Sequence, residues 1–246
     1  MSASSRLHVD PGSARLDRLD ALRGFAVVWM AGFHFCFDLS YFKLIGQNFY
    51  ADPFWTTQRT VIVSLFLFSA GLAQAVALQR DSGWVRFWRR WAQIAVCALF
   101  VSAGSALMFP NSFISFGVLH GIALMLIVLR LTERLGVWLW LAGLLALALP
   151  HLLQHAWFDS RWTNWLGLVT RKPLTEDFVP LLPWLGVMWW GLAGGRWILA
   201  RRPGWLTGAL PNPMRGLIWL GRWSLSFYML HQPVLVGALL LYTTIR

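Results

Sequence analysis

The chain has 246 residues, of which 57% are hydrophobic and only 13% are charged. A soluble globular domain carries about 25% charged residues, so this chain has too few ionic groups to cover a water-exposed surface. The same composition excludes a disordered chain and a small disulfide-stabilised secreted domain. The sequence therefore predicts an all-α, polytopic integral membrane protein, and its 17 tryptophans fit that class.

Seven stretches are apolar enough for a helix that crosses the hydrocarbon, which takes about 20 residues. They cover residues 19–41, 54–79, 90–109, 112–130, 135–153, 181–200 and 217–242. The alternating ten-residue segments of a membrane barrel are missing from the sequence. Residues 1–18 are polar and basic without the apolar core of a signal peptide. We therefore expect a cytosolic N-terminal tail over residues 1–18 and a single transmembrane domain over residues 19–246.

The net charge of +11 is explained by topology. With the N-terminus inside, 15 of the 21 Lys and Arg residues fall on the cytosolic side: Arg6, Arg15, Arg18, Arg23, Arg80, Arg86, Arg89, Arg90, Arg130, Arg134, Arg196, Arg201, Arg202, Arg215 and Arg222. The other 6 are Lys43, Arg59, Arg161, Arg171, Lys172 and Arg246. This bias follows the positive-inside rule and predicts a cytosolic N-terminus and an outer C-terminus. A nucleic-acid partner is not expected.

Ionisable residues inside a span are costly and usually functional, and the first span holds four of them: Asp20, Arg23, His34 and Asp38. Arg23 and His34 lie about 20° apart around a helix, with His34 about 16 Å further outward. Asp38 follows His34 at i+4, where the two side chains can meet. A carboxylate that orients an imidazole favours a general base, so we expect His34 and Asp38 to be catalytic. The alternative is a polar stripe that only packs helices together.

Further polar residues lie in three other spans. Arg59 either reaches the membrane surface or joins a site. His120 follows Gly117 in a Gly-x-x-x-Gly motif that permits close helix approach. The last span carries Tyr228, His231 and Gln232 before Pro233, which is expected to kink the helix and expose polar groups. Gly191 and Gly195 in the sixth span have the same small-residue spacing, most simply for packing.

Five segments resemble one known family. They are residues 18–26 (RLDALRGFA), 34–39 (HFCFDL), 116–120 (FGVLH), 177–184 (DFVPLLPW) and 224–233 (SLSFYMLHQP). Together they are similar to small bacterial members of the heparan-alpha-glucosaminide N-acetyltransferase catalytic-domain family, in the expected order. The Arg-x10-His spacing of Arg23 and His34 is also similar to membrane O-acyltransferases that modify bacterial surface polysaccharides. In contrast to the lysosomal enzyme of the family, residues 41–55 hold no histidine.

The resemblance implies a multi-pass acyltransferase of the bacterial cytoplasmic membrane. It would move an acetyl group from cytosolic acetyl-CoA to a sugar hydroxyl or amine of a cell-envelope glycan, without a metal. Arg23 would lie near the phosphates of the donor, and His34 would act on the acceptor. Residues for binding the acceptor are Arg59, His120, Asp177, Tyr228 and His231. The oligomeric state stays open, a homo-oligomer included.

Two other functions remain compatible with these residues. His34, His120 and His231 on different helices suit a b-type haem electron carrier, which uses paired axial histidines. Charges within the membrane also suit a transporter of a sugar or lipid precursor, although the sequence has no two related halves.

Overall fold

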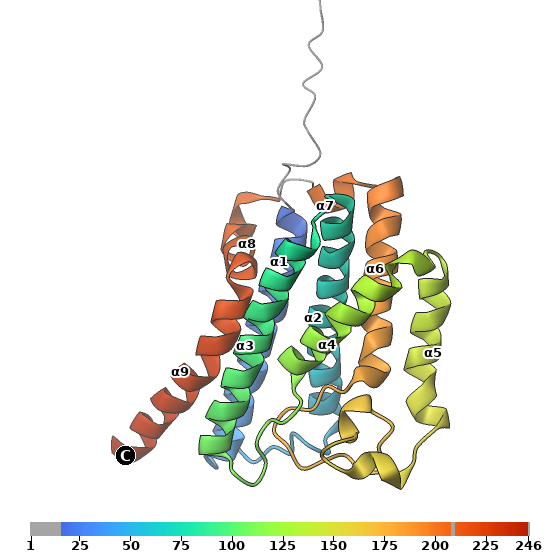
Figure 1. The fold of residues 1–246 in the computed structure, drawn as a ribbon. Helices are drawn as coiled ribbons and strands as arrows, with labels where there is room; N and C mark the ends of the chain where they lie inside the picture. Colours follow the sequence, from blue (N-terminus) through green and yellow to red (C-terminus); the bar gives the residue numbers. More distant parts are fainter. Residues whose placement is uncertain (1–15, 208–209, 246) are drawn as a thin grey trace, which may run out of the picture.

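The computed structural model describes residues 16–207 and 210–245, and most of these residues are helical. Figure 1 shows long helices that run side by side, with the connecting segments gathered at the two ends of the bundle. The predicted all-helical architecture is confirmed for this part of the chain. Residues 1–15 of the predicted cytosolic tail, and Arg246, lie outside the described residues.

The long helices in chain order are α1 (Asp17–Tyr41), α2 (Pro53–Gln79), α3 (Trp84–Met108), α4 (Val118–Thr132), α5 (Trp138–Leu152), α6 (Leu181–Arg201) and α9 (Ser224–Ile245). Two short helices are α7 (Gly204–Thr207) and α8 (Arg215–Arg222), and short 3-10 turns occupy Glu133–Leu135, Ala156–Asp159, Asn164–Leu166 and Asn212–Met214. Helices α1, α2, α3 and α9 are long and apolar enough to cross a membrane. The protein is therefore a helical membrane protein.

Several helix boundaries differ from the predicted spans. Helix α4 begins at Val118 rather than at 112, because residues 109–117 form a connection in which Pro110 and Asn111 favour turns. Helix α5 has only 15 residues. The last predicted span is two helices that meet at Trp223, and the chain stays helical through Pro233. The interruption thus lies ten residues before the proline that was expected to cause it.

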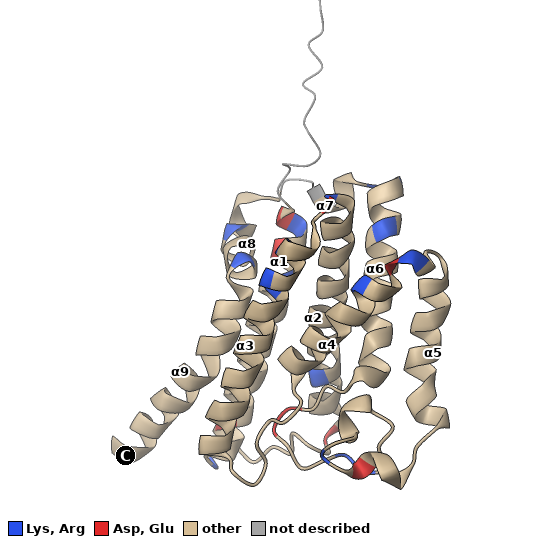
Figure 2. Cartoon of the chain, in the orientation of Figure 1, with Lys and Arg blue, Asp and Glu red and all other residues tan. Residues whose placement is uncertain are grey.

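The two ends of the bundle differ in charge. At one end α1 begins, α2 ends and α3 begins, and α7 and α8 lie beside them; we call this the basic end because most Lys and Arg residues gather there (Figure 2). The opposite end, which we call the loop end, carries residues 42–52, 109–117 and 153–180 (Figure 1). The charge bias that the sequence predicted therefore corresponds to one face of the fold.

The central contact of the bundle joins α2 to α6 through glycines. A Cβ on Gly191 would lie 2.3 Å from the carbonyl oxygen of Phe68, and one on Gly71 would lie 2.3 Å from that of Met188. A Cβ on Gly195 would lie 2.6 Å from the Cβ of Ala75. The small-residue spacing of α6 therefore serves packing, as predicted. The fully buried core lies beside this contact and includes Leu67, Met125, Leu129, Met188 and Leu192.

The Gly-x-x-x-Gly motif of α4 has a different partner from the expected one. Gly117 lies just before the helix, and a Cβ there would meet the carboxylate of Asp177. A Cβ on Gly121 would lie 2.7 Å from the carbonyl oxygen of Val179. The two glycines therefore admit the extended segment 177–179 of the loop end and not a neighbouring helix.

Candidate functional site

A cavity of about 410 Å³ lies between α2, α3 and α4, with contributions from α1 and α9. On the α2 side its wall includes the small side chains of Ala70, Ala73 and Ala77, together with Phe66, Ser69 and Gln74. The facing wall is apolar and bulky, with Phe87, Trp91, Ile94, Leu119, Ile122 and Leu126. An apolar channel of this kind accepts a slender, largely uncharged chain.

Four arginines line the part of the cavity that belongs to the basic end: Arg23, Arg86, Arg90 and Arg130. Polar contacts hold each guanidinium in place: Arg86 donates to Ser82 Oγ at 3.3 Å, and Arg90 donates to the side chain of Gln93 at 3.2 Å. Arg130 donates to the carbonyl of Ser82 at 3.1 Å and lies over the ring of Trp84. Guanidinium groups bind phosphate with directed hydrogen bonds. The sequence pointed to Arg23 alone, because the positive-inside rule already accounts for the other three.

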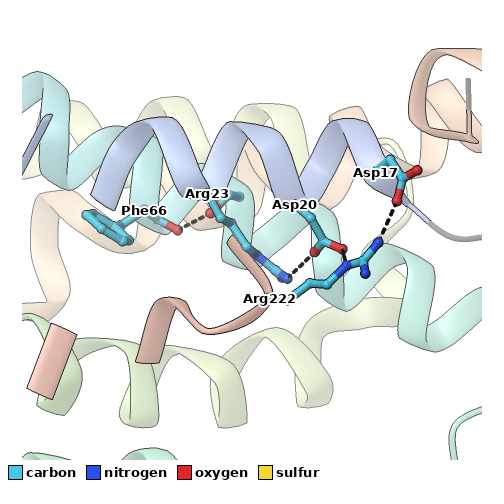
Figure 3. A network of polar contacts seen from close by, with 6 residues as sticks. Asp17, Asp20, Arg23, Phe66 and Arg222 are labelled. Carbon is cyan, nitrogen blue, oxygen red and sulfur yellow. Dashed lines mark hydrogen bonds and ion pairs between the residues drawn. The ribbon is translucent and has the colours of Figure 1, made fainter. Parts of the chain in front are cut away.

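Arg23 also belongs to a charge network that joins α1 to α8 (Figure 3). Asp20 lies between two arginines, with Arg23 at 3.5 Å and Arg222 at 3.6 Å. Arg222 additionally donates to Asp17 at 3.0 Å. The ion pair with Asp20 holds the Arg23 side chain at the cavity wall, and Asp20 is itself held by Arg222.

The cavity reaches inward to Val118 on α4 and Tyr228 on α9. Tyr228 is linked to a histidine pair, because His231 Nδ1 lies 2.8 Å from the backbone carbonyl oxygen of Tyr228. His231 Nε2 in turn lies 2.7 Å from His34 Nδ1, and the two rings are stacked at 5.0 Å. The described lining of the cavity includes Tyr228 but neither His34 nor His231.

The hydrogen bonds determine which nitrogen of each neutral imidazole carries a proton. A carbonyl oxygen only accepts, so His231 Nδ1 carries the hydrogen and its Nε2 is an acceptor. His34 Nδ1 must then donate to His231 Nε2, which leaves the Nε2 of His34 with a free lone pair. A free imidazole nitrogen held in a fixed orientation can act as a base or nucleophile.

The expected pair of His34 and Asp38 does not form. Asp38 is buried, and its Oδ1 accepts from the side chain of Gln232 at 2.7 Å, while its Oδ2 has no partner among the described residues. The residue that orients His34 is His231, which lies 197 positions away in the sequence. The i,i+4 spacing permitted a contact between His34 and Asp38. Instead, each of these side chains is hydrogen-bonded to α9, His34 to His231 and Asp38 to Gln232.

His120 has its two nitrogens engaged in the α3–α4 connection. Its Nδ1 accepts from the backbone N–H of Gly117 at 3.3 Å, and its Nε2 lies 3.2 Å from Ser102 Oγ. Because the Ser102 hydroxyl donates to the carbonyl of Ile114, its oxygen accepts from His120 Nε2. This histidine therefore holds the entry to α4, and the structure keeps it apart from the His34–His231 pair.

Asp177 connects the loop end to the cavity. Its Oδ2 accepts from the backbone N–H of Val118 at 2.7 Å, so it caps α4 where the cavity ends. Burial raises the pKa of the Asp177 carboxyl, and the Val118 N–H, Arg59 and Lys172 act in the opposite direction. The carboxylate is also close enough to Tyr228 for the two side chains to interact electrostatically.

Two cations face Asp177 from the loop end. Arg59 on α2 is partly buried, and Lys172 lies over the ring of Tyr50. Burial lowers the pKa of Lys172, and the nearby charge of Arg59 lowers it further. The structure thus brings Arg59, Asp177 and Tyr228 into one electrostatic neighbourhood, whereas Lys172 was not among the predicted site residues.

The histidine pair is too close to hold a metal ion between its two rings. His34 Nδ1 and His231 Nε2 are hydrogen-bonded at 2.7 Å, which leaves no room for a metal ion between them, since each metal–nitrogen bond takes about 2 Å. Among the described residues no group of three or more His, Cys, Asp or Glu side chains could hold a metal ion.

A comparison with protein families gives one match. A sequence model with the description heparan-alpha-glucosaminide N-acetyltransferase, catalytic, matches residues 15–233. These residues include both histidines of the pair, the four arginines of the cavity and Asp177. No curated protein and no solved structure matches the chain.

Proposed function

Since the chain belongs to the heparan-alpha-glucosaminide N-acetyltransferase catalytic-domain family, a family of membrane acyltransferases, we propose that it transfers an acetyl group from cytosolic acetyl-CoA to a sugar on the other side of the membrane. The observation that carries this proposal is the cavity, which is cationic at one end and apolar within, and reaches the residue bonded to the histidine pair. Coenzyme A has the complementary distribution, with phosphates at one end and a thin arm ending in sulfur.

The proposal includes a topology. The basic end faces the cytosol, in keeping with the positive-inside rule, and the chain crosses the membrane seven times with its C-terminus outside. In this arrangement α8 and α9 together make the seventh crossing, and the loop end meets the acceptor. The location is the bacterial cytoplasmic membrane, and the acceptor is a glycan of the cell envelope.

In the proposed reaction His34 acts as the base. Its free Nε2 takes a proton from the hydroxyl or amine of the acceptor, whose oxygen or nitrogen attacks the thioester carbon. The carbon–sulfur bond breaks, and the proton passes from His34 to the departing thiolate of CoA. A covalent variant, in which His34 Nε2 first accepts the acetyl group and then passes it to the acceptor, uses the same free lone pair.

Other residues support this reaction. His231 fixes the ring of His34 and stabilises its protonated form through their hydrogen bond, so Asp38 is left with a role in holding Gln232 on α9. Arg59, Asp177 and Tyr228 contact the acceptor between the loop end and the cavity. Arg23, Arg86, Arg90 and Arg130 bind the phosphates of the donor.

Transfer of radiolabelled acetyl from acetyl-CoA to envelope glycans, measured in sealed inverted vesicles, tests the proposal. We expect His34→Ala to lower the rate by about 10²–10⁴-fold, the range for removal of a general base. The control is His151→Ala, because His151 is exposed on α5. Full activity of His34→Ala, or uptake of the sugar without consumption of acetyl-CoA, would refute the proposal, and the second result would indicate a transporter.

A second pair of variants tests the donor site. Arg89 and Arg90 are both exposed, but only Arg90 belongs to the described lining of the cavity. We expect Arg90→Gln to raise KM for acetyl-CoA by about tenfold or more with little change in kcat, because a charge-assisted hydrogen bond contributes about 1.5–3 kcal/mol. Arg89→Gln should leave KM unchanged. Equal effects of the two variants would contradict the assignment of the cavity to the donor.

A further inference from the structure

One polar side chain in the cavity wall has no assigned role so far. Gln74 on α2 lines the cavity among Ala70, Ala73 and Ala77. It lies about one turn before the end of α2, on the side of the arginines, while Val118 and Tyr228 mark the inner end of the cavity. Gln74 therefore lies in the α2 wall of the cavity, with Ala70 and Ala73 toward the loop end and Ala77 toward the basic end.

The side chain of Gln74 is 7% exposed, and its Nε2 has no hydrogen-bond partner among the described residues. Buried amide donors are nearly always paired, so an unpaired one in a cavity wall requires a physical reason. Ser69 on the same wall shows the contrast, because its hydroxyl donates to the carbonyl of Phe66 at 2.9 Å. Among the described lining residues, the amide of Gln74 is thus a buried donor without a partner, and the neighbouring alanines let a ligand approach it closely.

This donor suits a ligand with a carbonyl oxygen on a thin, otherwise apolar chain. The pantetheine arm of coenzyme A carries two secondary amides and no charge along its length. We propose that Gln74 Nε2 donates a hydrogen bond to an amide carbonyl of the pantetheine arm and so positions the thioester. The inference rests on the proposed use of acyl-CoA as the donor, and it makes Gln74 a specificity-determining residue for that donor.

The test compares two ligands with the purified full chain: CoA, which has phosphates, and pantetheine, which has the amides but no phosphate. Titration calorimetry should show that Gln74→Leu weakens the binding of both ligands by about tenfold, the effect of one hydrogen bond. Arg90→Gln should weaken the binding of CoA alone. Gln79→Leu is the matched control, because Gln79 is exposed on the same helix outside the described lining, and it should change neither affinity.

The unfolding temperature without ligand separates a binding role from a structural one. Removal of an unpaired buried donor should leave the unfolding temperature of Gln74→Leu equal to that of the wild type or higher. If Gln74→Leu fails to fold, Gln74→Met keeps about the length of the side chain and removes the donor without adding a charge, and it should weaken both ligands in the same way.

Unchanged affinity for pantetheine in the folded variants would overturn the inference, as would a wild-type protein that binds neither ligand. A wild-type protein that binds CoA and pantetheine through Gln74 but transfers no acetyl group would refute the proposed function and leave this inference standing.

Discussion

The contact between α1 and α8 gives a prediction whose size follows from the geometry. A Cβ on Gly24 would lie 1.9 Å from the carbonyl oxygen of Leu217 and 2.7 Å from the carbonyl carbon. These are backbone atoms, so no side-chain rotation relieves the clash, and Gly24→Ala has to push α8 away from α1 by more than about 1 Å. Overpacking of this kind costs about 1–3 kcal/mol. The displacement also strains the ion pairs of Arg222 with Asp17 and Asp20.

Gly32→Ala is the matched control on the same helix, because nothing lies within 4 Å of its added Cβ. Alanine is favoured over glycine in a helix by about 0.5–1 kcal/mol, so this variant should be as stable as the wild type or more stable. For a chain of this size each kcal/mol shifts the unfolding temperature by about 2–4 °C. Thermal unfolding of the purified protein in detergent measures both variants. Gly24→Ala as stable as Gly32→Ala would refute the close α1–α8 contact.

Two further predictions concern residues outside the described lining of the cavity. Replacement of His120 by Ala should lower the unfolding temperature, because Gly117 N–H and Ser102 lose a buried partner at a cost of about 1–3 kcal/mol. The kcat of the folded variant should stay unchanged. A selective loss of kcat without loss of stability would instead indicate a role in the reaction. In the loop end, the hydroxyl and backbone N–H of Thr170 donate hydrogen bonds to Asp159 and lower the pKa of its carboxyl. The contact therefore stabilises the loop fully above the ordinary carboxyl pKa, and this stabilisation is lost as the pH falls through the lowered pKa. Hydrogen exchange at the Thr170 amide, corrected for the intrinsic rate, should rise over that range in the wild type but not in Asp159→Asn, and identical pH profiles would contradict the assignment.

The sequence was sufficient to identify the helical membrane class, because so low a charge content in a chain of this length is typical of proteins that face lipid. It also pointed to His34, since an ionisable group at membrane depth is costly enough to require a purpose. The partner of His34 was wrong for a physical reason: neighbours at i+4 are visible in a sequence, whereas contacts between α1 and α9 depend on how the helices pack. His231 was named as a site residue, but its position against His34 could not be derived.

The arginine-lined cavity shows a second limit of sequence reasoning. The positive-inside rule already explained the positions of Arg86, Arg90 and Arg130 in the sequence. Nothing further therefore indicated that the three side chains line one cavity. Gln74 carries no charge and lies in an apolar helix, so the hydropathy pattern does not indicate it as a site residue. Only the structure shows that its amide is buried without a partner. Likewise, the glycines of α4 fitted a helix-packing motif, although their partner is the extended segment 177–179.

The histidine pair joins the first long helix of the chain to the last, with 197 residues between its members. During synthesis at about 5–20 residues per second, roughly 10–40 s pass between the appearance of His34 and that of His231. Over that interval the ring of His34 has neither its hydrogen-bond partner nor a fixed orientation. The hydrogen-bonded pair therefore forms only when α9 has entered the bundle, so an incomplete chain that has already inserted its earlier helices lacks it.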